Sequence, residues 1–328
     1  MAVIGASAIT MADIAKTLDP NGAMATVINL LAQQNEIMDD IPWMSTNKTT
    51  SHLTTVRTGL PTPGWRRFNE GAATSKGAVA QFEETCGIME GWSEVDEDLA
   101  NLYDNPAAFR MQEDAAWVQG MTETLASTLF YGSKGSDPRQ FDGLATRYSS
   151  LTGPYADSML SAGGSGSDNT SVWIVTWSDN TVHGIYPKNS AAGLKQQDLG
   201  PETKADANGN PYRVLRTKFQ WQCGLAVRDW RHVVRICNID VSNLVGESGA
   251  ADLVKLIIRG LERIPNLGAG RTAIYCNRQV RTMLRLQILA KSNVNLTFDT
   301  IAGRRVLAFD GVPVRMVDRL LATEAAIA

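Results

Sequence analysis

Residues 105–132, NPAAFRMQEDAAWVQGMTETLASTLFYG, carry the clearest helix signal in the chain. Asn105 suits an N-cap, Pro106 suits the first helical position, and Gly132 suits the end of a helix. The apolar residues between these ends recur at helical spacing; they are Val118, Met121, Leu125 and Leu129. The stretch therefore predicts one helix over 105–131, roughly 35 to 40 Å long at the usual rise per residue.

Downstream of this helix, the sequence alternates predicted strands and helices, which indicates a mixed α+β fold. Within the strand-rich part, Val234 and Ile236 flank Arg235, which predicts a half-buried strand whose polar face meets water or a neighbour. The predicted elements are a hairpin of strands 172–177 and 181–186, a loop over 187–209, a strand-rich stretch over 212–240, a helix over 250–264, a strand over 271–276, a helix over 278–291, and a final hairpin of 305–309 and 312–317.

The first 40 residues predict two short amphipathic helices separated by residues 19–22, DPNG. Isolated helices this short are marginal in water, so they need another surface to lie against. Their apolar faces consist of Met11, Ile14, Ala15 and Leu18 in the first helix and Met24, Val27, Ile28 and Leu31 in the second.

Residues 49–90 are rich in threonine and broken by glycine and proline. They predict either an extended hairpin projecting from the body or an ordinary surface hairpin. Between its strands lies Trp65-Arg66-Arg67-Phe68. Arginine beside aromatic residues is found in nucleic-acid patches, but the number of such residues here is small. Because the same residue types are enriched at protein interfaces, we expect these four residues to contact a neighbouring subunit.

The bulk composition describes a folded protein without a strong charge. The chain has 328 residues, 44% hydrophobic and 20% charged, with a net charge of −3. The length suggests two domains or one core with long excursions, and the charge excludes a global positive field for nucleic acid. The four cysteines form no Cys-x-x-Cys pair, so we expect free thiols in a reducing compartment. No stretch is apolar enough to predict a membrane span, and no basic region precedes the apolar residues at the N-terminus, so secretion is not indicated.

The sequence offers little for catalysis. It contains three histidines and none of the common nucleotide-binding, metalloprotease, esterase or calcium-loop motifs. The acidic run over 94–98 is either a cation site or, as we favour, the start of a helix. The glycine-rich stretch over 153–168 leads into a strand and has no lysine, so we expect a flexible loop instead of a phosphate cradle. We predict no catalytic residue, cofactor or metal.

The order of these elements resembles the Hong Kong 97-type major capsid proteins of tailed double-stranded-DNA bacteriophages along the whole chain. Three phrases support the resemblance: FDGL at 141–144, TSVWIV at 170–175 with GIYPK at 184–188, and FDGVPV at 309–314. The resemblance implies an α+β fold with an arm at 1–48, an extended loop at 49–90, a peripheral domain at 91–150, 223–240 and 300–328 with a spine helix at about 105–131, and an axial domain at 151–222 and 241–299.

The resemblance also implies function. It predicts a structural protein that assembles with itself through pentamers and hexamers into an icosahedral shell. The shell is assembled in the host cytoplasm and encloses double-stranded DNA without sequence-specific binding. The short arm implies a separate scaffolding protein, and a portal and a decoration protein are expected partners. Lys76 lies in the loop where some members crosslink, but that chemistry is not carried over. An encapsulin-type shell protein and a metabolic α/β enzyme remain the alternatives.

Overall fold

The computed structural model describes residues 33, 35–102, 105–206, 208–246, 250–289, 296–301 and 304–328. The chain divides into two compact units. Unit 1 contains Ile88–Leu125 and Gly193–Gln222, and unit 2 contains Gln34–Gly87, Ala126–Ala192 and Cys223–Ala328.

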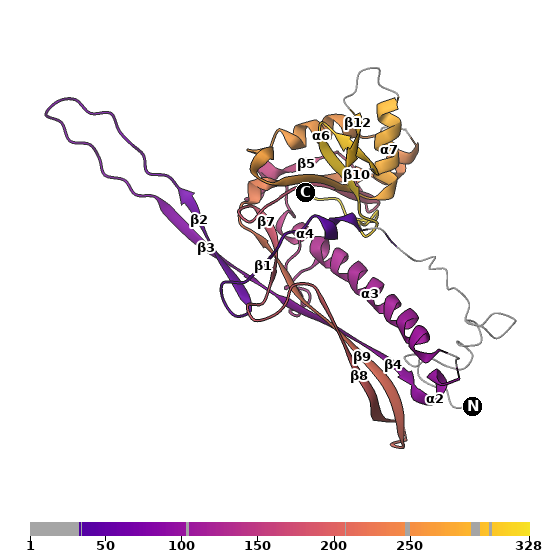
Figure 1. Ribbon diagram of the computed structural model, residues 1–328. Coiled ribbons are helices and arrows are strands. Elements are labelled where there is room, and N and C mark those ends of the chain that lie inside the picture. Colours follow the sequence, from indigo (N-terminus) through magenta and orange to yellow (C-terminus); the bar gives the residue numbers. More distant parts are fainter. Residues whose placement is uncertain are drawn as a thin grey trace. The chain divides into compact units, whose positions relative to one another are not determined.

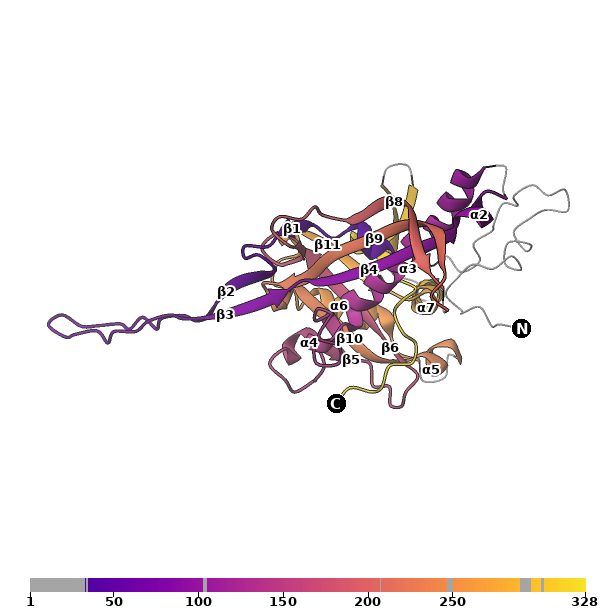
Figure 2. The ribbon, with the colours of Figure 1, turned by 90° about the horizontal axis from the view of Figure 1, so that it is seen from below.

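Unit 1 packs helices against a small sheet. Strand β9 pairs with both β8 and β4, and Figure 2 shows the three strands side by side. Val95, Ala100 and Phe109 form the buried core, with Leu99 and Leu215 packed against it. The elements are β4 (Gly87–Asp96), α2 (Glu97–Ala100), the first part of α3 (Pro106–Tyr131), β8 (Leu194–Ala205) and the first part of β9 (Pro211–Val227).

The two helix starts in unit 1 are capped as the sequence predicts. The Asn105 carboxamide oxygen accepts a hydrogen bond from the Ala108 N–H at 3.2 Å, which confirms the start of the long helix. The Asp96 carboxylate accepts from the N–H groups of Asp98 and Leu99, so the acidic run does begin a helix.

Unit 2 is larger and contains a mixed sheet and a separate hairpin. Its sheet strands are β1 (Trp43–Ser45), β5 (Met159–Ser161), β6 (Asn169–Trp177), β7 (Val182–Tyr186), the end of β9, β10 (Val233–Asp240), β11 (Arg271–Cys276), β12 (Leu296–Ile301), β13 (Arg304–Phe309) and β14 (Val312–Met316). Strands β2 (Ser51–Gly59) and β3 (Ala78–Thr85) form a sheet of their own. The helices are the end of α3, α4 (Leu144–Arg147), α5 (Val241–Gly246), α6 (Leu253–Leu261) and α7 (Arg278–Leu289).

Strand β6 is the centre of the unit 2 sheet. It pairs antiparallel with β10 on one side and β11 on the other, and all of its residues are buried. Helices α6 and α7 cover one face (Figure 1), where Gly260 lets α6 approach Ile174 closely. The other face carries an aromatic cluster in which Trp173 lies 6.0 Å from Phe130 and 6.1 Å from Tyr148 between ring centroids. The full burial of β6 explains its apolar run over 172–175, and the buried polar residues that flank this run are Asn169, Thr170, Ser171 and Thr176.

A buried ionic cluster ties the C-terminal segment to this sheet. Arg235 of β10 donates to Glu324 at 2.9 Å and to the Tyr148 carbonyl at 2.7 Å. Glu324 also accepts from the hydroxyls of Tyr131 and Ser171. The side chains of Arg235 and Glu324 are only 5% and 7% exposed. The sequence prediction that Arg235 meets water or a neighbour is therefore wrong, because β10 lies between two strands and its charge is neutralised inside the unit.

A second buried carboxylate fixes the segment before β1. Asp40 accepts from the Tyr275 hydroxyl at 2.7 Å, from Arg271 at 2.6 Å and from Arg315 at 3.2 Å. Three residues later, Trp43 lies opposite Gly184 in the parallel pairing of β1 with β7. The chain around residues 36–45 is thus a fixed part of unit 2.

Other sequence predictions are confirmed or corrected by the structure. The strand 271–276, the helices near 250–264 and 278–291, and the final hairpin at Asp310-Gly311 are present. Strands 172–177 and 181–186 do not form a hairpin, because β6 and β7 run parallel and share only the pair Trp177 and Val182. The predicted loop 187–209 contains strand β8, whose mostly polar, exposed residues gave no alternating signal. The predicted loop 153–168 contains β5, which pairs with β10.

Candidate subunit interface on the extended hairpin

The hairpin of β2 and β3 is anchored at its base. Ser51 pairs with Thr85 and His52 with Glu84, and both Ser51 and His52 are buried. The Glu84 carboxylate accepts hydrogen bonds from both terminal nitrogens of Arg147, one of them at 2.7 Å. Next to it, hydrogen bonds from Ser51 and Lys48 hold the pKa of Glu83 below its usual value. The base of the hairpin is therefore joined to the packed part of unit 2.

The far end of the hairpin is solvent-exposed. Trp65 and Phe68 have relative exposures of 106% and 100%, so neither ring is covered by the part of the chain that the structure describes. Arg66 donates to the Glu70 carbonyl at 3.3 Å, and Asn69 adopts a positive φ of 64° in the turn. The structure thus brings Trp65, Arg66, Arg67 and Phe68 together at one exposed loop, called here the hairpin tip. Three further large apolar side chains are exposed along the same hairpin: Leu60, Val79 and Phe82.

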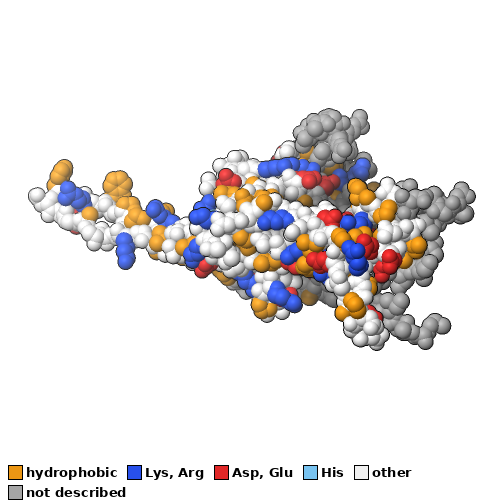
Figure 3. Space-filling view, turned by 60° about the horizontal axis from the view of Figure 1, so that its bottom comes forward, with side chains coloured by type: hydrophobic (Ala, Val, Ile, Leu, Met, Phe, Trp, Pro, Cys, Tyr) orange, Lys and Arg blue, Asp and Glu red, His pale blue; other side chains and the backbone are white. Residues whose placement is uncertain are grey.

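The exposed part of the hairpin carries positive charge in an otherwise acidic chain. Residues 55–82 contain one acidic residue, Glu70, against four basic residues, Arg57, Arg66, Arg67 and Lys76, whereas the whole chain has a net charge of −3. Figure 3 shows hydrophobic and basic side chains following one another along this hairpin. Exposed aromatics interleaved with arginine are typical of a protein contact surface.

Two of the three histidines, His52 and His183, pack against each other inside unit 2. His52 and His183 meet edge to face at 5.4 Å between ring centroids, and both are buried. Burial, with His52 and Arg228 nearby, lowers the pKa of His183 to about 4. His183 is therefore neutral near pH 7 and poorly suited to carry protons.

The cysteines and carboxylates form no metal centre in the part of the chain that the structure describes. Burial raises the pKa of Cys86 to about 11 and that of Cys223 and Cys276 to about 12, so these thiols are not activated. No helix among the described residues is long and apolar enough to cross a membrane.

A sequence model of the family "Major capsid protein GP7" matches residues 19–328 of this chain. This chain belongs to the GP7 family of major capsid proteins. Its fold is similar to a capsid structure of bacteriophage epsilon15, with 32% identity and a TM-score of 0.80, over 100% of this chain and 99% of that one. The chain is thus a structural component of a virion capsid, and the sequence resemblance to the Hong Kong 97-type capsid proteins is confirmed.

A more distant capsid structure also shares the fold. The bacteriophage JBD30 capsid is 11% identical with a TM-score of 0.51, over 95% of this major capsid protein and 99% of that chain. An encapsulin from Synechococcus elongatus is 11% identical with a TM-score of 0.47, over 71% and 96% of the two chains. The comparison with curated protein sequences finds no match.

For a major capsid protein, the functional surfaces are those that bind other copies, and the hairpin tip is one candidate. The predicted arm residues Met11, Ile14, Leu18, Val27 and Leu31 lie outside the described residues. A groove beside Trp117 and Met121 of α3 was missed by the sequence reasoning. The i, i+4 spacing of Trp117 and Met121 places both on one helix face, but it does not indicate the strand that they meet.

Proposed function

We propose that copies of this chain assemble as pentamers and hexamers into an icosahedral phage shell, with each hairpin lying across an adjacent copy. The observation that carries the proposal is the full exposure of Trp65 and Phe68 at the hairpin tip of a capsid-family chain. Burying an aromatic side chain of this size stabilises a contact by about 1.5 to 3 kcal/mol. We infer that a second copy supplies this burial.

The division into arm, extended loop, peripheral domain and axial domain stays a prediction of the sequence. Within it, we propose that residues 1–48 form an arm that packs against a neighbouring copy through the apolar faces of its two predicted helices. Because residues 36–45 are held by Asp40 and β1, the test is a deletion of residues 2–33 that leaves this anchor in place. We expect a folded subunit with defective shells, and normal shells would exclude the arm hypothesis.

We also propose the wider assembly. A separate scaffolding protein and a portal take part in the host cytoplasm, a decoration protein is a further candidate partner, and double-stranded DNA fills the interior without sequence-specific contacts. The net charge of −3 and the pI near 5.7 favour a shell that encloses DNA without binding it tightly. The proposed role has no catalytic step.

The experiment is electron microscopy with sedimentation of the purified chain, prepared with and without a candidate scaffolding protein. Closed shells, or pentamers and hexamers, are the expected result. The contents of the shells then separate a phage capsid, which holds DNA, from a compartment that holds enzymes. A monodisperse monomer or dimer in both preparations would overturn the proposal.

A further inference from the structure

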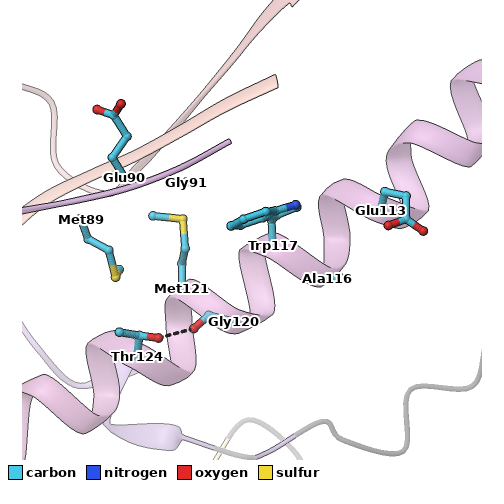
Figure 4. A pocket seen from close by; sticks show the side chains of 9 residues that line it. All are labelled: Met89, Glu90, Gly91, Glu113, Ala116, Trp117, Gly120, Met121 and Thr124. Carbon is cyan, nitrogen blue, oxygen red and sulfur yellow. Dashed lines mark hydrogen bonds between the residues drawn. The ribbon is translucent and has the colours of Figure 1, made fainter. Parts of the chain in front are cut away.

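Unit 1 contains a groove of about 510 Å³ between strand β4 and helix α3 (Figure 4). Trp117 and Met121 project from α3 toward Gly91 of β4, and a Cβ atom on Gly91 would lie 2.9 Å from the Trp117 ring. At Gly120 the opposite holds, because a Cβ atom there would meet nothing within 4 Å apart from its chain neighbours and the backbone of its own helix. The groove therefore has an apolar floor of tryptophan and methionine and is open above Gly120.

The lining of this groove includes two glutamates, Glu90 and Glu113, and the Glu90 side chain points away from α3 (Figure 4). Glu90 is engaged by Lys218 at 3.1 Å and by the Trp92 indole N–H at 2.9 Å. Glu113 has no Lys or Arg partner among the described residues, and burial together with Asp114 raises its pKa. A carboxylate in this setting is stabilised by an arriving cation. The groove thus combines an apolar floor with one carboxylate that a basic partner would neutralise.

The hairpin tip has the complementary chemistry. It presents two uncovered aromatic rings beside Arg66 and Arg67, on a hairpin with four basic residues and one acidic residue over 55–82. The N-terminal stretch 1–32 is a poorer match, because it carries two acidic residues and one basic residue. Charge complementarity therefore favours the hairpin tip over the N-terminal stretch as the occupant.

We propose that the groove of one copy receives the hairpin tip of a second copy, with Trp65 or Phe68 against Trp117 and Met121 and an arginine beside Glu113. This inference rests on the proposed function, since it names the partner surface of the same interface. An aromatic anchor in an apolar pocket, flanked by a charge pair, is the usual composition of a strong contact between proteins.

The first test places a photo-crosslinking amino acid at residue 68 of the full chain. Assembled shells are irradiated, digested and analysed by mass spectrometry. Adducts between copies within residues 88–124 are expected. Shells whose adducts fall elsewhere would overturn the groove assignment and leave the capsid function intact. An unsubstituted chain that forms no shells under any condition would overturn both.

The second test fills the groove without disturbing the fold. Gly120→Leu places a bulky side chain over the floor, whereas Gly120→Ala is the matched control that adds one methyl group. Both substitutions suit a helix, and neither Cβ meets anything within 4 Å apart from its chain neighbours and the backbone of its own helix. Shell yield is expected to fall about tenfold with leucine and to stay near normal with alanine. Normal yield with leucine would overturn the proposal.

A charge exchange gives an independent readout. Arg67→Glu and Glu113→Arg alone should each lower shell yield by about tenfold, because each places like charges together at the contact. The double variant restores the opposite charges and should recover most of the yield. Equal loss in the double variant and the single variants would overturn the pairing of these two residues.

Discussion

The guanidinium group of Arg235 and the carboxylate of Glu324 meet at 2.9 Å inside unit 2, although 89 residues separate them. Burial also raises the pKa of Tyr131 well above its usual value, so its hydroxyl remains a donor to the same carboxylate. The backbone adds to this attachment, since Asn238 exchanges hydrogen bonds with Ile327 at 2.8 and 2.9 Å. The C-terminal segment is therefore part of the packed unit.

Replacing Glu324 by glutamine should destabilise the subunit strongly. The substitution leaves Arg235 charged, buried and without its counter-ion, which costs about 3 to 5 kcal/mol. The free energy of unfolding, measured by urea titration and tryptophan fluorescence, checks this value. Glu83→Gln is the matched control, because Glu83 pairs with Lys48 at an exposed position and its loss should have little effect. Equal effects of the two substitutions would contradict the prediction.

Replacing Asp40 by asparagine should release the segment before β1. Asp40 is buried and bound by Tyr275, Arg271 and Arg315, so its charge loss leaves the cations poorly paired at a cost of about 3 kcal/mol. Hydrogen exchange of residues 36–46 should become faster. The neighbouring Asp39→Asn is the control, because Asp39 is exposed. Unchanged exchange in the Asp40 variant would show that β1 pairing alone holds the segment.

Replacing Gly143 by alanine should destabilise the turn that follows α3. A Cβ atom there would lie 2.6 Å from the Thr128 carbonyl oxygen and 2.7 Å from that of Phe130. Overpacking of this kind costs about 1 to 3 kcal/mol, and the expected result is a lower midpoint in urea. Gly135→Ala in the same loop is the control, since its nearest neighbour is a Ser133 side-chain oxygen at 3.6 Å.

The stability of the subunit should decrease below pH 6.5 because of His183. Its pKa falls from 6.5 in the unfolded chain to about 4 in the fold, so only the unfolded state binds the proton between these values. The free energy of unfolding is therefore highest above pH 6.5 and loses up to about 3 kcal/mol by pH 4. Urea titrations across this range should show a smaller loss in His183→Gln. Identical pH profiles for the two proteins would contradict the prediction.

Local sequence signals predicted those parts of the fold that local interactions decide. The two ends of α3 were predicted correctly from the Asn105 cap, the proline after it and the glycine at residue 132. The final turn was predicted from Asp310-Gly311. Contacts between distant residues had no such signal. Arg235 looked like a surface residue because its partner, Glu324, lies far along the chain. Strand β8 was missed because its pairing with β9 depends on backbone hydrogen bonds and not on apolar side chains.

The candidate interface was predictable only in part. Trp65 and Phe68 stood out because glycine and proline surround them and no apolar pattern gives them a core. The groove was not predicted, because Gly91 and Trp117 become neighbours only when β4 and α3 pack together.

Among the described residues, the hairpin of β2 and β3 is joined to the packed part of unit 2 at its base. A two-stranded hairpin without a hydrophobic face against a core is marginal in water. Its outer part can therefore bend, while the sheet around β6 keeps its packing. In a closed surface made of identical chains, neighbours meet at more than one angle. A subunit whose sheet around β6 keeps its packing while its hairpin bends can make contacts at each of these angles with one sequence.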